Sequence, residues 1–92
     1  MQDPYLSIID QHWENILMVY QIFKGKNPII EYDIDDQKIY AYSANDYIQT
    51  LSSRTREETQ NLYQDAIRMD KFMLFVKDTK NRRLRSYIFS LS

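Results

Sequence analysis

His12 is the only histidine in this chain of 92 residues, and it is the first side chain to consider as a general base or a metal ligand. A histidine metal site needs partner ligands, but the sequence contains no second histidine and no cysteine. The nearby acids Asp10 and Glu14 stand two residues away, and positions i and i+2 do not share a helix face. We therefore expect His12 to be a helix residue beside Trp13, without a catalytic or metal-binding role.

A group of acids could form an oxygen-rich cation site: Glu31, Asp33, Asp35 and Asp36. Their spacing lacks the glycine and the terminal glutamate of an EF-hand loop. Alternating acids followed by an Asp-Asp pair are also typical of a solvated strand face that ends in a hairpin turn. We expect the solvated strand face and no metal site.

Glycine and cysteine usage excludes several kinds of catalytic site. Loops that cradle phosphates or dinucleotides need several residues that tolerate positive φ and close backbone approach, and the chain has a single glycine, Gly25. The absence of cysteine removes disulfides, thiolate zinc sites, iron–sulfur clusters and thiol nucleophiles. The sequence therefore predicts a protein that is not an enzyme, with no catalytic residues, no cofactor and no bound metal.

A basic segment near the end of the sequence is the sharpest positive feature. The net charge is only −1, yet Asp78 is the one acid after residue 70. The candidate partner- or anion-binding residues of this segment, which is followed by Tyr87 and Phe89, are Lys77, Lys80, Arg82, Arg83 and Arg85. A basic β-hairpin with nearby aromatic residues can follow a nucleic-acid backbone. It can equally protect a sheet edge from aggregation or pair with the acidic segment.

A long amphipathic helix is expected over residues 4–23. Asp3-Pro4 provides an N-cap and a first-turn proline, and Gly25 provides a stop. The apolar stripe that recurs at three- and four-residue spacing is Leu6, Ile9, Trp13, Ile16, Leu17, Tyr20 and Phe23. Three further apolar residues lie outside this stripe, so this half of the helix needs a second neighbour; these candidate self-association residues are Met18, Val19 and Ile22.

The middle of the chain predicts a β-hairpin at residues 29–42 and two helices. Its register stays open: a two-residue turn puts Ile39 and Ala41 on the face of Ile30, whereas a three-residue turn puts Tyr40 and Tyr42 there. Capping-box patterns predict helices from Ser43 through Leu51 and, starting at Thr55, over about 56–69.

The last third predicts a second hairpin. Residues 72–76 are apolar on both faces, as in a central strand, and a turn at 78–82 leads to a last strand at 83–89. The resulting order α-β-β-α-α-β-β predicts a single α+β domain over 1–92. We expect a largely antiparallel four-stranded sheet, made from two hairpins, with the helices packed on one face.

Tyrosine is abundant, with eight residues in the chain. A core of this size would have difficulty satisfying so many hydroxyls, so we expect several at the surface or an interface. The alternative is that they lie at the sheet margin as ordinary strand formers. The candidates are Tyr5, Tyr40, Tyr42, Tyr47 and Tyr87.

These features favour a small interaction, adaptor or regulatory protein that is not an enzyme, acts on a protein partner and self-associates, with a homodimer as one form. The alternative is a small regulator that binds nucleic acid or another polyanion through the basic hairpin 77–85. No apolar run approaches the roughly 20 residues needed to cross a bilayer, and the first residues do not look like a secretory signal. We therefore expect a soluble cytoplasmic protein with no membrane partner.

Overall fold

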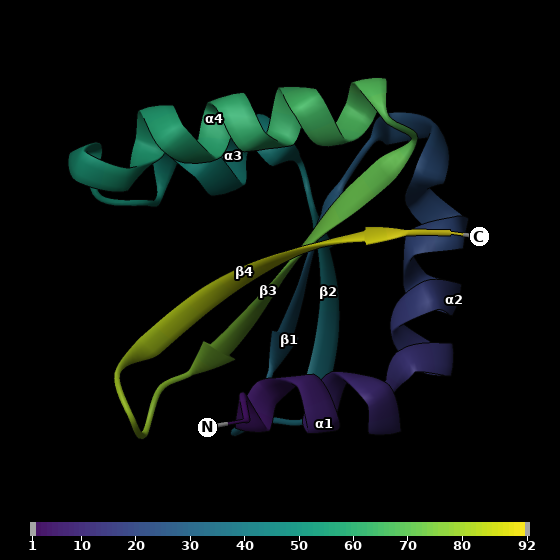
Figure 1. Ribbon diagram of the computed structural model, residues 1–92, viewed down its shortest axis with the longest axis vertical. Helices are drawn as coiled ribbons and strands as arrows, with labels where there is room; N and C mark the ends of the chain where they lie inside the picture. The colour runs from purple at the N-terminus through teal and green to yellow at the C-terminus, as the bar shows by residue number, and fades with distance from the viewer. Residues whose placement is uncertain (1, 92) are drawn as a thin grey trace.

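Four strands form one mixed sheet in the computed structural model, which describes residues 2–91 (Figure 1). The strands are β1 (Ile29–Asp33), β2 (Lys38–Tyr42), β3 (Lys71–Asp78) and β4 (Arg83–Ser90), in the order β2-β1-β3-β4. The two hairpins are antiparallel, whereas the central strands β1 and β3 are parallel. The expected α+β class and the two hairpins are confirmed. The sheet is mixed because the chain passes through two helices before β3 starts in the direction of β1.

Helices cover both faces of the sheet. Helices α1 (Pro4–Gln11) and α2 (Trp13–Phe23) pack on one face, where their buried residues meet Ile30, Tyr32 and Leu74. Helices α3 (Ala44–Gln49) and α4 (Ser53–Arg68) pack on the other, against Ile29, Met73 and Phe75. The expectation of helices on one face was therefore wrong. The central strands are apolar on both faces, so a single helix layer would leave one apolar face in water.

The first helix predicted from the sequence is divided at His12. This residue has φ −110° and ψ 13°, outside the helical range, and α1 and α2 run in different directions (Figure 1). The division lets Tyr5 and Ile9 of α1, as well as Ile16 and Tyr20 of α2, face the same sheet. Asp3 caps α1 as expected, since its carboxylate accepts a hydrogen bond from the Tyr5 N–H at 2.9 Å.

Helix α2 does not end at Gly25. A 3₁₀ turn, η1 (Lys24–Lys26), follows α2, and the chain turns at Asn27, which has a left-handed φ of 48°. Apart from glycine, which has no Cβ atom to clash, asparagine is one of the few residues that adopts this left-handed conformation readily. The predicted end of the helix at residue 23 is confirmed, but the left-handed residue that follows it is Asn27 and not Gly25.

The β1–β2 register is set by a four-residue turn, residues 34–37, between Asp33 and its partner Lys38. Tyr32 pairs with Ile39 and Ile30 with Ala41, the face assignment expected for a two-residue turn. An even number of turn residues gives the same alternation in both cases.

The other face of β1 is not solvated, contrary to the sequence-based expectation. Glu31 and Asp33 are only 6% and 7% exposed.

The turn between β3 and β4 lies away from α3 and α4, which cross the opposite end of the sheet (Figure 1). Within residues 2–91, no helix combines the length and apolar character needed to cross a bilayer.

Candidate functional site

An open groove of about 440 Å³ lies on the face of the sheet that carries α3 and α4. It is formed where β1, the end of α3 and the β3–β4 hairpin come together. Its lining residues are Glu31, Tyr47, Thr50, Lys77, Asp78, Thr79, Arg82, Arg83 and Leu84. The groove thus combines a buried carboxylate, cationic side chains, hydroxyls and an apolar wall, the mixture expected of a small-molecule site.

A hydrogen-bonded pair of buried side chains forms the floor of this groove. The Tyr47 hydroxyl of α3 donates to Oε2 of Glu31 at 2.7 Å, and Tyr47 is only 6% exposed. Burial, followed by this hydrogen bond to the carboxylate, raises the pKa of Tyr47 far above its ordinary value. Tyr47 therefore stays protonated and continues to donate to Glu31.

Aromatic rings extend from this pair toward the edge strand β2. The ring centroids of Tyr47 and Phe75 are 4.8 Å apart, those of Tyr42 and Tyr47 5.3 Å, and those of Tyr40 and Tyr42 5.8 Å. Burial, followed by the charge of Glu31, raises the pKa of Tyr42, while the charge of Lys77 lowers it. The charges of Glu31 and Lys77 therefore change the pKa of the same phenol in opposite directions.

Lys77 and Arg82 are cations at the rim of the groove, and both are exposed. The ion pairs within residues 2–91 are Arg68–Asp65 and Arg85–Asp3, so neither rim cation has an acidic partner there. Arg83 lines both the groove and a hollow on the opposite side of the hairpin, beside α1. The rim thus offers at least two cations to an external anion.

The rest of the basic segment lies elsewhere. Nη1 of Arg85 is 3.2 Å from Oδ2 of Asp3, and its guanidinium lies over the Tyr5 ring, 5.7 Å from the centroid. Lys80 lines a separate hollow beside α1 and the β1–β2 turn. The five predicted binding residues are therefore not one continuous strip: Lys77, Arg82 and Arg83 share the groove, whereas Lys80 and Arg85 do not.

The N-terminal segment and the β3–β4 hairpin are joined by hydrogen bonds between tyrosines and aspartates. The Tyr5 hydroxyl donates to Asp78 at 2.7 Å, and the Tyr87 hydroxyl donates to Asp3 at 2.6 Å. These bonds are the largest cause of the lowered pKa values of Asp78 and Asp3. Burial, followed by the bond to Asp3, raises the pKa of Tyr87 to about 12.

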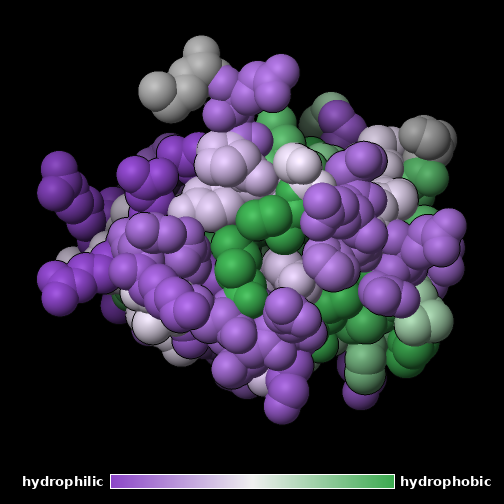
Figure 2. Space-filling model, turned by 90° about the horizontal axis from the view of Figure 1, so that it is seen from below, coloured by the Kyte–Doolittle hydropathy of each residue, from purple (hydrophilic) through white to green (hydrophobic). Residues whose placement is uncertain are grey.

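The three predicted self-association residues on α2 have different surroundings. Met18 and Ile22 are 54% and 68% exposed, whereas Val19 packs against the core. Phe23 adds a further exposed apolar side chain at the end of α2. Seen from the end of the molecule that carries α1, hydrophobic residues reach the surface in patches between hydrophilic ones (Figure 2).

The remaining candidates show no arrangement for chemistry. His12 stacks on Tyr32 with ring centroids 5.0 Å apart. The acids of the first hairpin serve the fold: Asp33 accepts from the Asp36 N–H at 3.1 Å, and Asp35 accepts from the Thr79 N–H at 2.9 Å. In the part of the chain that the structure describes, no three acid or histidine side chains come together as a metal site.

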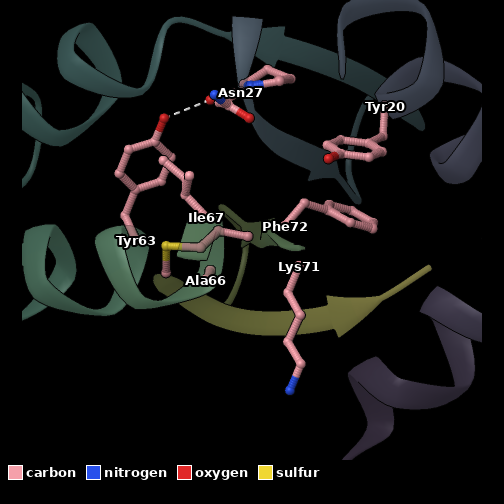
Figure 3. Close-up of a pocket in the computed structure, with 9 residues that line it drawn as sticks. Tyr20, Asn27, Tyr63, Ala66, Ile67, Lys71 and Phe72 are labelled. Carbon is pink, nitrogen blue, oxygen red and sulfur yellow. Dashed lines mark hydrogen bonds between the residues drawn. The ribbon is translucent and has the colours of Figure 1, made fainter. Parts of the chain in front are cut away.

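A further hollow, between α4 and the start of β3, is too small for a ligand. Its volume is about 10 Å³, room for at most one water molecule. The Tyr63 hydroxyl points to the Asn27 carbonyl oxygen across it, at 2.7 Å (Figure 3).

No family model matches this chain, and neither a characterised protein nor a solved structure does. The candidate site therefore rests on its geometry. The sequence did not single out Glu31 and Tyr47 as a pair, because they are 16 residues apart and meet only after α3 folds over β1. The available signal was the position of Glu31 between apolar neighbours, Ile30 and Tyr32, in β1, one of the two central strands.

Proposed function

We propose that this protein is an interaction protein without catalytic activity that self-associates through the outer face of α2. The observation that carries the proposal is the exposure of Met18 and Ile22, two large apolar side chains one helical turn apart. Covering exposed apolar side chains with a partner removes them from water, and this lowers the free energy of the complex. A cytoplasmic location is part of this proposal, and cell fractionation tests it.

The charges that flank this face favour a second copy of the same chain as the partner. Glu14, Met18 and Ile22 follow one another at four-residue spacing, a ridge suited to helix–helix packing, and Lys26 lies four residues further on. In an antiparallel twofold pair, Met18 of one copy meets Ile22 of the other. The same symmetry brings Glu14 of each copy toward Lys26 of its partner.

Sedimentation over a range of protein concentrations tests this arrangement. Wild-type protein is expected to reach twice the chain mass of 11.2 kDa. Ile22→Glu is expected to remain at the single-chain mass, because it places a charge in the apolar contact. Met69→Glu is the matched control, because Met69 is a similarly exposed methionine at the end of α4. The control should associate like the wild type.

A charge exchange tests the antiparallel geometry. Glu14→Lys and Lys26→Glu should each weaken association, and the double variant should restore it. A wild-type protein that sediments as a single chain at every concentration contradicts the proposal, as does equal loss from Ile22→Glu and Met69→Glu.

The alternative, a polyanion-binding regulator that uses the hairpin 77–85, has less support. A nucleic-acid backbone needs a continuous row of cations. Lys80 lines a different hollow from Lys77, and Arg85 is already paired with Asp3. The cations that remain around the groove suit a smaller anion.

A further inference from the structure

We propose that the groove between α3 and the β3–β4 hairpin binds a small organic anion that also carries an amino or hydroxyl group. Lys77 and Arg82 would hold the anionic group, and Glu31 would accept a hydrogen bond from the donor group. This site is independent of the α2 face through which we propose self-association.

Glu31 supplies the first half of the argument. Glu31 is 6% exposed. Within the described residues, its carboxylate accepts one hydrogen bond from a side chain, that of Tyr47. A carboxylate has about four acceptor positions, and neither oxygen of Glu31 is a buried atom without a partner, so the positions that Tyr47 leaves open are accessible from outside. Because Glu31 lines the groove, a ligand donor there can use the remaining capacity.

The rim cations supply the second half. Across the sheet Glu31 pairs with Phe75 and Asp33 pairs with Lys77, so Lys77 is the diagonal neighbour of Glu31 on the same face. Lys77 and Glu31 form no ion pair with each other, so the space between them suits a molecule with an anion at one end and a donor at the other.

The size of the groove favours a small ligand over a macromolecule. Its volume of about 440 Å³ lies within the usual range for small-molecule pockets, about 300–1,000 Å³. Leu84 and the Tyr47 ring supply apolar wall beside the charged groups. A phosphate or a carboxylate meets the requirement at Lys77 and Arg82, since both are anions that accept hydrogen bonds from cations.

Calorimetric titration with small probe molecules tests whether the groove binds the anionic group and the donor group of one ligand together. Phosphoethanolamine carries both groups, methyl phosphate carries only the anion, and ethanolamine carries only the ammonium. We expect phosphoethanolamine to bind at least about tenfold more tightly than methyl phosphate, which is the effect of one charge-assisted hydrogen bond. β-Alanine replaces the phosphate with a carboxylate and tells which anion the rim prefers.

Three variants locate the binding in the groove. Glu31→Gln keeps an acceptor for Tyr47 but removes the charge, so the tenfold preference should disappear while methyl phosphate binds at least as tightly, because a nearby negative charge is gone. Lys77→Gln should weaken both probes. Lys80→Gln is the matched control, because Lys80 is on the same hairpin but outside the groove, and it should weaken neither. Melting curves show whether each variant is folded.

The proposal is overturned if phosphoethanolamine fails to bind at millimolar concentration, or if it binds no better than methyl phosphate. It is also overturned if an RNA oligonucleotide binds more tightly than the probes and Lys80→Gln weakens it as much as Lys77→Gln. That outcome would instead support the basic hairpin as a nucleic-acid contact.

Discussion

Three tyrosine hydroxyls in the described residues donate to carboxylates from distant parts of the chain: Tyr47 to Glu31, Tyr5 to Asp78 and Tyr87 to Asp3. The tyrosine hydroxyls therefore find acceptors inside the fold, and the carboxylates find donors. The sequence predicted surface positions for these tyrosines, and this was wrong for Tyr5 and Tyr47, which are 4% and 6% exposed. Composition shows how many hydroxyls need partners, but not that the fold brings acids to them.

Replacing Tyr47 by phenylalanine should lower the free energy of unfolding by about 1–3 kcal/mol, because the buried Glu31 carboxylate loses its hydrogen bond. Tyr63→Phe is the matched control. Its hydroxyl donates to a carbonyl in an exposed position, so its loss should cost less. Denaturant unfolding measures both. Adding Glu31→Leu to Tyr47→Phe should recover part of the loss, and a larger loss in Tyr63→Phe would contradict this account.

Acid should reduce the stabilising effect of Asp78. Its hydrogen bond from Tyr5 lowers its pKa in the folded protein, so this contribution is fully present above the usual aspartate pKa of about 3.9 and is lost as the pH falls through the lower folded value. Asp78→Asn should therefore be less stable than the wild type at neutral pH, and the difference in melting temperature should shrink in acid. Tyr5→Phe should weaken the same pH dependence. A difference that is constant from pH 7 to strong acid would refute the assignment.

At the scale of elements, the turns use left-handed conformations without glycine. Asn27, Gln37, Asp70 and Arg82 all have φ between 48° and 60°, whereas Gly25 does not have a positive φ. Asparagine and aspartate adopt this conformation at moderate cost, but glutamine and arginine have no such advantage. Gly25, which the sequence offers as the stop of the first helix, is therefore not the residue that takes the left-handed conformation there; Asn27 is.

Gln37→Gly should stabilise the protein by about 0.5–1 kcal/mol. Glycine removes the strain of the left-handed conformation, and this gain exceeds the entropy that the more flexible glycine loses on folding. The side chain of Gln37 is exposed, so little packing is lost. Asp36→Gly, one residue earlier in the same turn, is the control. Asp36 is not among the left-handed residues, so this change should destabilise. Thermal unfolding distinguishes them, and equal effects would count against strain at Gln37.

The helices show how far local patterns predict the fold. The predicted helix over 56–69 corresponds to α4, but α4 begins at Ser53, so the Thr55 capping pattern does not mark its start. The first predicted helix corresponds to α1 and α2, whose separation at His12 carries no proline or glycine signal. Periodicity identified the apolar residues of both segments, and the bend depends on the sheet against which they pack.

At the scale of the whole molecule, the sequence predicted the order of elements better than their layers. The apolar segment 72–76 was correctly placed in the centre of the sheet, as β3. The pattern cannot show that α3 and α4 lie on the face opposite α1 and α2, because both faces of β3 are equally apolar. For the same reason the groove, which exists only where these layers meet the hairpin, could not be predicted.

The parallel contact between β1 and β3 also has a consequence for the rate of folding. Each hairpin closes locally, but Val76 reaches Tyr32 only after the loop formed by β2, α3 and α4 has closed. Val76→Ala should therefore slow folding, whereas Ile88→Val on the outer strand β4 should mainly speed unfolding. Stopped-flow kinetics over a range of denaturant concentrations separates the two effects. Closure of this central pair is the step that we expect to limit how fast the chain folds.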